Sequence, residues 1–138
     1  MKTMMRSLYT AGIASMILSL SGCTSGAPQC ADSDVQELVV DISVKEGKRQ
    51  AGYASLLQGL KHSSSEEEKQ DLQVMMDNID KRYEGMSLTA IRTHESNDEI
   101  QKVTCKGQLL FSNQATFDIS YTAQYTEDGQ LFVEVYGL

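Results

Sequence analysis

The chain has 138 residues, of which 22% are charged and 41% hydrophobic, the composition of a single globular domain. Its formal net charge of −7 argues against a nucleic-acid-binding protein, because such proteins need a basic surface to displace counterions from phosphates. Three cysteines and two histidines supply few ligands for a zinc site, so no metal or other cofactor is expected.

Residues 1–22 have the pattern of a secretory signal peptide. Lys2 and Arg6 make the start of the segment positive, and the apolar stretch from residue 8 to residue 20 carries no charge. That stretch is too short for a comfortable membrane span, which needs about 20 apolar residues. A signal peptide is therefore favoured over a retained transmembrane helix.

The end of this segment carries a more specific motif. Leu20-Ser21-Gly22-Cys23 resembles the lipobox of bacterial lipoproteins, in which a leucine and two small residues precede the cysteine. The resemblance implies that Cys23 becomes the lipid-modified N-terminus and that its acyl chains anchor the protein in the lipid bilayer. In enteric bacteria an Asp after this cysteine marks inner-membrane lipoproteins, so Thr24 favours the outer membrane, facing the periplasm. An ordinary cleaved signal with a coincidental cysteine is the alternative.

Helical spacing dominates the first half of the remaining chain. Capping boxes at Ser33–Gln36 and Ser65–Glu68 predict two helix starts, because the serine hydroxyl can accept from an unpaired backbone amide. Apolar residues at intervals of three and four predict three helices. We expect the first to end at Gly47, the second before Ser63 and the third at Gly85.

From residue 88 onward the apolar period changes from 3.6 to 2, which predicts β-strands. Four strands are expected, with a polar turn at residues 95–98 and a hairpin turn at Asp128-Gly129. Alternation places one set of side chains on the face toward the helices: Val103, Cys105, Gly107, Leu109, Phe111, Phe117, Ile119, Tyr121, Ala123, Tyr125, Leu131, Val133 and Val135.

These elements predict one α+β domain over residues 31–138, preceded by a lipid-bearing Cys23 and a short tether to residue 30. Two to three helices would pack on one face of a four-stranded antiparallel meander, whose other face would be solvated. Helices followed by such a meander, on a lipobox-bearing chain of this length, are similar to the small cystatin-like and NTF2-like lipoproteins of bacterial envelopes. The resemblance is architectural and implies no active-site residue.

Cys30 and Cys105 remain as a pair once Cys23 is assigned to lipid. The periplasm is oxidising, so a disulfide between them is the simplest expectation. The alternative is a reactive Cys105 thiol assisted by His62 or His94, although no residue that would orient the histidine can be identified.

One group of side chains on the solvated face of the sheet is a candidate binding surface. Aromatic and arginine side chains often dominate interfaces, because they bury a large area at little entropic cost. Packing beneath a second layer would explain the apolar members equally well. The candidate residues are Arg92, Leu110, Gln124, Phe132 and Tyr136.

No Gly-rich phosphate loop, GxSxG, HExxH or CxxC motif occurs in the chain, and no catalytic residue is assigned. We therefore expect a non-catalytic envelope lipoprotein that binds a periplasmic protein or a cell-wall component, as inhibitors, immunity proteins and accessory proteins do. The alternatives are an enzyme that uses an NTF2-like cavity and a passive structural component of the envelope.

Overall fold

The computed structural model describes residues 26–138, so the predicted signal peptide, the lipobox and Cys23 lie outside the described residues. Three helices precede a four-stranded antiparallel sheet with the strand order β1-β2-β3-β4, which confirms the α+β class and the meander. The elements are α1 (Ser33–Gln50), α2 (Tyr53–His62), α3 (Glu66–Tyr83), β1 (Ser87–Asn97), β2 (Lys102–Leu110), β3 (Thr116–Tyr125) and β4 (Leu131–Tyr136).

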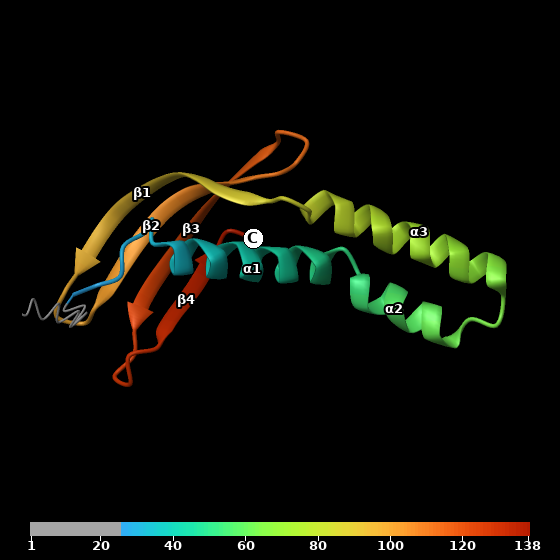
Figure 1. Ribbon diagram of the computed structural model, residues 1–138, viewed down its shortest axis with the longest axis horizontal. Helices are drawn as coiled ribbons and strands as arrows, with labels where there is room; N and C mark the ends of the chain where they lie inside the picture. The colour runs from blue at the N-terminus through green and yellow to red at the C-terminus, as the bar shows by residue number, and fades with distance from the viewer. Residues whose placement is uncertain (1–25) are drawn as a thin grey trace, which may run out of the picture.

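The three helices differ in how much of the sheet they cover. Helix α1 lies across the sheet between β1 and β4, and it buries Val35 and Val39 completely. Helices α2 and α3 form an antiparallel hairpin that extends beyond the end of the sheet (Figure 1). Their apolar stripes pack mainly against each other, so α1 is the helix that covers the sheet.

Helix boundaries follow local chemistry, with two differences from the prediction. The N-cap of α1 is Asp32 and not Ser33, and the Gln36 side chain donates to the carbonyl of Ala31. The predicted end at Gly47 is wrong, because α1 continues to Gln50 and the chain turns at Gly52, whose φ of 77° suits glycine.

Gly47 serves a packing role inside α1. The Tyr83 ring of α3 lies directly against it, and a Cβ at this position would collide with the ring. The glycine thus allows α3 to approach α1, at the point where the helical hairpin meets the rest of the domain. The start of α3 is as predicted, since the Ser65 hydroxyl accepts from the amide of Glu68.

The core lies between α1 and the inner face of the sheet. Val103, Cys105 and Leu109 of β2 are buried, as the alternation predicted. Tyr121 of β3 is fully buried, and its hydroxyl donates to the carbonyl of Cys30 at 2.9 Å. Burial raises the pKa of Tyr121 to about 12, so the phenol stays protonated and can keep donating.

A disulfide joins Cys30 to Cys105 across 75 residues, with the two Cα atoms 5.8 Å apart, and confirms the predicted pair. Because Cys105 is bonded and fully buried, it is not the reactive thiol of the alternative hypothesis. The bond fixes the start of α1 to the second strand. It also brings Ala27 beside the β1–β2 turn, where its amide donates to Asp98.

Strand β1 differs from the prediction in length and regularity. It continues through residues 95–97, which were predicted as a turn, and the turn follows at residues 98–101. Its pairing with β2 shifts register twice, between Thr89 and Arg92 and between Thr93 and Glu95. Ala90 lies in the first shift with a φ of 50°, a left-handed conformation that alternation in a sequence cannot reveal.

Candidate functional site

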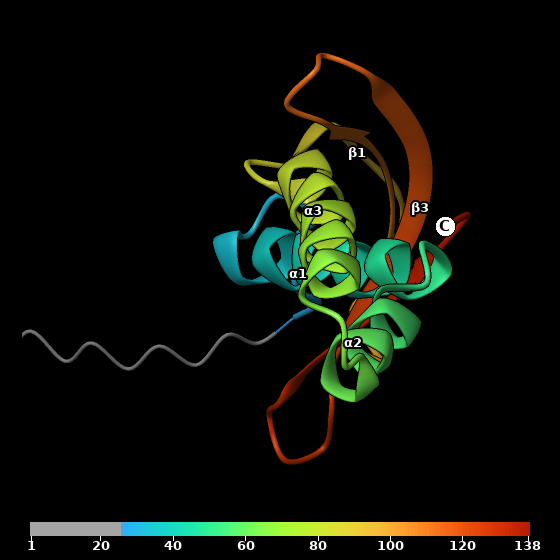
Figure 2. The same ribbon diagram turned by 90° about the vertical axis from the view of Figure 1, so that its right-hand side faces the viewer.

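The outer face of the sheet is open across all four strands in the described part of the chain. Figure 2 shows the three helices gathered on the opposite side. This face presents side chains from β1 to β4 in cross-strand rows that the pairing defines. One row is Asn97, Lys102, Gln124 and Phe132; the next is Glu95, Thr104, Thr122 and Glu134; the third is Arg92, Lys106, Ser120 and Tyr136.

The two aromatic candidates are exposed. Phe132 is 53% exposed and Tyr136 is 47% exposed, so neither is a core residue of the described domain. The Tyr136 hydroxyl donates to the Glu134 carboxylate at 3.0 Å. The outward side chains of β4 are therefore, in order, the Phe132 ring, the Glu134 carboxylate and the Tyr136 ring.

The five candidate residues share a face but do not form one cluster. Gln124 lies directly opposite Phe132, and its amide nitrogen donates to the Ile100 carbonyl. Tyr136 lies in the row of Arg92, separated from it by β2 and β3. Leu110 is paired with Thr116 at the other end of the sheet. The face therefore offers a broad surface without a single focus.

Two basic residues that sequence analysis did not assign to the site belong to these rows. Lys102 lies opposite Gln124, and Lys106 lies opposite Arg92. Alternation in β2 already put both lysines on the solvated face. Their neighbours on β1 could not be foreseen, because the two register shifts decide which residues meet.

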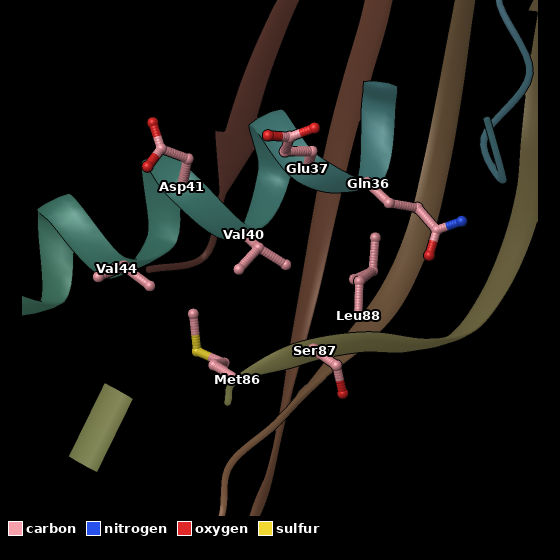
Figure 3. A pocket seen from close by; sticks show the side chains of 8 residues that line it. All are labelled: Gln36, Glu37, Val40, Asp41, Val44, Met86, Ser87 and Leu88. Carbon is pink, nitrogen blue, oxygen red and sulfur yellow. The ribbon is translucent and has the colours of Figure 1, made fainter. Parts of the chain in front are cut away.

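The inner side of the domain has a shallow hollow between α1 and β1, of about 390 Å³ (Figure 3). Val40, Val44, Met86 and Leu88 form its apolar lining. Glu37 and Asp41 also border it, but their carboxylates project away from Met86 and Leu88, as Figure 3 shows. Within this hollow no nucleophile meets an acid–base pair.

A smaller apolar hollow, of about 140 Å³, lies between α1, the end of α3 and the sheet. Tyr83 and Phe111 contact each other there, with ring centroids 6.0 Å apart. Phe117 lines the same hollow and is 46% exposed, although alternation predicted it inside the core. It does face inward, but it borders the hollow, which leaves part of its ring uncovered.

The titratable residues considered from the sequence do not assemble into a catalytic group. His62 ends α2, beyond the sheet, and His94 is exposed on β1. Among residues 26–138, no three His, Cys, Asp or Glu side chains gather where they could hold a metal ion. In the same residues, no helix is both long enough and apolar enough to cross a membrane.

One charged cluster lies at the base of the helical hairpin. Lys48 Nζ is 2.6 Å from Asp80 Oδ1 and 5.2 Å from the centre of the Tyr53 ring, while the Tyr53 hydroxyl donates to Asp80 Oδ2. The hydrogen bond from Lys48 lowers the pKa of Asp80, and the hydrogen bond to Asp80 raises the pKa of Tyr53. The cluster links α1, α2 and α3, which gives it a structural role.

No protein-family model, no curated protein and no solved structure matches this chain.

Proposed function

We propose that this protein is a non-catalytic binding module of the bacterial cell envelope, anchored in the bilayer through a lipid on Cys23. In this proposal it faces the periplasm from the outer membrane and binds a periplasmic protein or a cell-wall component. Inhibitors, immunity proteins and accessory subunits act in this way. The motif at residues 20–23 supports the anchor.

The observation that carries the binding role is the open outer face of the sheet. The face carries two exposed aromatic rings, Phe132 and Tyr136, and three basic side chains, Arg92, Lys102 and Lys106. Exposed rings become favourable anchors when a partner covers them. A ring buries a large apolar area, and only two side-chain torsions lose their freedom. The inner face of the sheet, in contrast, is filled by its packing against α1 and by the Cys30–Cys105 disulfide.

The test is recovery of a partner from periplasmic extract by the purified protein. Phe132→Ala and Tyr136→Ala are expected to reduce the recovered partner by about tenfold or more, which corresponds to roughly 1.4 kcal/mol. Phe117→Ala is the matched control, because Phe117 is exposed to a similar degree on the opposite face. Loss of the partner with all three variants, or with none, would contradict the proposed surface.

The anchor has a separate test. Cys23→Ser is expected to abolish incorporation of labelled palmitate and to move the protein from the membrane fraction to the soluble fraction. A wild-type protein that incorporates no label and fractionates as soluble would contradict the lipid anchor while leaving the binding surface open to its own test.

A further inference from the structure

The two edge strands of the sheet, β1 and β4, differ in how well they could pair with an additional strand. The β1 edge carries two register shifts and a left-handed Ala90, and residues 27–31 lie beside its Ile91 and Thr93. Such irregular edges are poor templates for pairing. Strand β4 is regular, with six consecutive pairs to β3 and neither proline nor lysine.

The free edge of β4 has unused backbone groups. A strand pairs with its neighbour through alternate residues, so an edge strand leaves the remaining amides and carbonyls unpaired. Within residues 26–138, every backbone hydrogen bond of β4 belongs to its ladder with β3. β4 is therefore the edge of this sheet at which a further strand can add.

The surroundings of β4 are acidic. No lysine or arginine occurs in β3, in β4 or in residues 33–44 of α1. Asp34, Glu37 and Asp41 of α1 border a hollow of about 370 Å³ that Leu131, the first residue of β4, also lines. Of these three carboxylates, only Asp41 has a cation, Lys45, in the described part of the chain.

Glu134 stands at the centre of the outer side of β4 and has no cationic partner among the described residues. Phe132 and Tyr136 flank it two residues away on either side, on the same face. A cationic side chain directly opposite Glu134 on a neighbouring strand would meet its carboxylate and would lie diagonal to Phe132 and Tyr136. The edge is thus matched to positive charge.

We infer that β4 accepts an extended, lysine- or arginine-bearing segment of a partner protein as a fifth strand. This inference rests on the proposed binding function and names the chemistry of its partner. A cation of the segment lies opposite Glu134, between Phe132 and Tyr136. The alternate, apolar residues of the segment extend the inner face formed by Leu131, Val133 and Val135.

A second copy of this chain fits the edge poorly. When two β4 strands pair symmetrically and antiparallel, outward side chains meet outward side chains, so Glu134 lies opposite or diagonal to its own copy. Like charges placed in this way oppose pairing, and no described lysine or arginine of β3 or β4 would relieve them. The charge pattern therefore selects a cationic partner.

The experiment uses the purified full chain and a fluorescein-labelled nine-residue peptide in which Val and Lys alternate. Binding is followed by fluorescence anisotropy at low ionic strength. We expect Glu134→Lys to weaken binding by about tenfold or more, and to bind instead a matched peptide with Glu in place of Lys. Glu95→Lys is the control, because Glu95 ends the same cross-strand row at the β1 edge and should leave the affinity unchanged.

Strand addition has its own signature. A peptide methylated on the amide nitrogens of one edge should lose binding, while methylation of the other edge should leave it intact. Equal effects of Glu95→Lys and Glu134→Lys, or equal binding of both methylated peptides, would overturn the inference. Dimerisation of the free protein through β4 would overturn it in favour of a second copy.

Circular dichroism melts of both lysine variants verify that they are folded, and Glu134→Gln provides a milder change at the same site. Failure of this inference is distinguishable from failure of the proposed function. If Phe132→Ala and Tyr136→Ala lose the periplasmic partner while the peptides do not discriminate, the outer face binds its partner and the β4 edge does not.

Discussion

The domain has two regions, the sheet covered by α1 and the hairpin of α2 and α3. Both regions carry apolar stripes, yet they differ sharply in how much of this apolar surface is buried. The first region holds a continuous core, including the fully buried Val35, Val39 and Tyr121, and the disulfide. In the hairpin, only Met76 is buried. The length of an apolar stripe is therefore not a measure of stability, because the stripe stabilises the fold only where other residues bury it. We expect the hairpin to open locally well before the sheet unfolds.

The largest expected effect comes from breaking the Cys30–Cys105 bond, which lies entirely within the first region. The bond spans 75 residues, and loops of this length give about 2–4 kcal/mol of stability in practice. Urea unfolding of the oxidised protein, with the reduced and alkylated protein as comparison, measures the difference. Coincident unfolding curves would mean that the core alone holds α1 on the sheet.

A smaller loss is expected from Gly47→Ala, at the junction of the two regions. The added methyl would displace the Tyr83 ring, and overpacking of this kind costs about 1–3 kcal/mol. Hydrogen exchange should report faster opening of the hairpin than of β2 and β3. Gly59→Ala is the control, because its methyl meets only the flexible Leu72 side chain and alanine favours the helix. Equal destabilisation by both variants would contradict the junction role.

The hairpin should also loosen in acid. The folded-state pKa of Asp80 is depressed by its hydrogen bond from Lys48, so its contribution is present above the ordinary value of 3.8 and is lost as the pH falls below it. The hydrogen-exchange protection factors of α2 and α3, which correct for the slower intrinsic exchange in acid, should therefore fall as the pH falls, and Asp80→Asn should remove most of that fall. Asp71→Asn, an exposed change on the same helix, should not.

The smallest effect on stability is expected from Phe132→Ala. The ring is 53% exposed on the open face, and substitutions at such sites usually change the free energy of unfolding by less than about 0.5 kcal/mol. Val133→Ala, the buried neighbour on the same strand, should cost clearly more. A large drop in melting temperature for Phe132→Ala would assign the ring a packing role that the domain does not show.

Sequence patterns predicted the features that depend on local chemistry or on a strict period. The cysteine pair followed from the expected compartment, and alternation placed Val103, Cys105 and Leu109 in the core. The same reasoning reached Phe132 and Tyr136 as outward-facing residues. It could not reach Ala90, because a register shift breaks the period on which the prediction depends.

Other differences arise from tertiary packing. Periodicity detected the stripes of α2 and α3, but it does not say that these stripes face each other beyond the sheet. Phe117 faces inward as predicted, but it is 46% exposed because it borders a hollow, which alternation in the sequence cannot reveal. Gly47 resembles a helix end in sequence, and only the approach of Tyr83 explains its place inside α1.

The docking of Ala27 and Cys30 on the sheet sets how the molecule would stand on a membrane. If Cys23 carries lipid as proposed, the four peptide units from Cys23 to Ala27 reach about 14 Å at full extension. The β1–β2 turn, where Ala27 is held by Asp98, would then lie nearest the bilayer. The hairpin occupies the opposite end of the long axis (Figure 1), so it would point away from the lipid. Such a short connection would hold the domain close to the bilayer and limit its tilt. It would thereby set the height and orientation at which β4 and the open face meet a periplasmic partner.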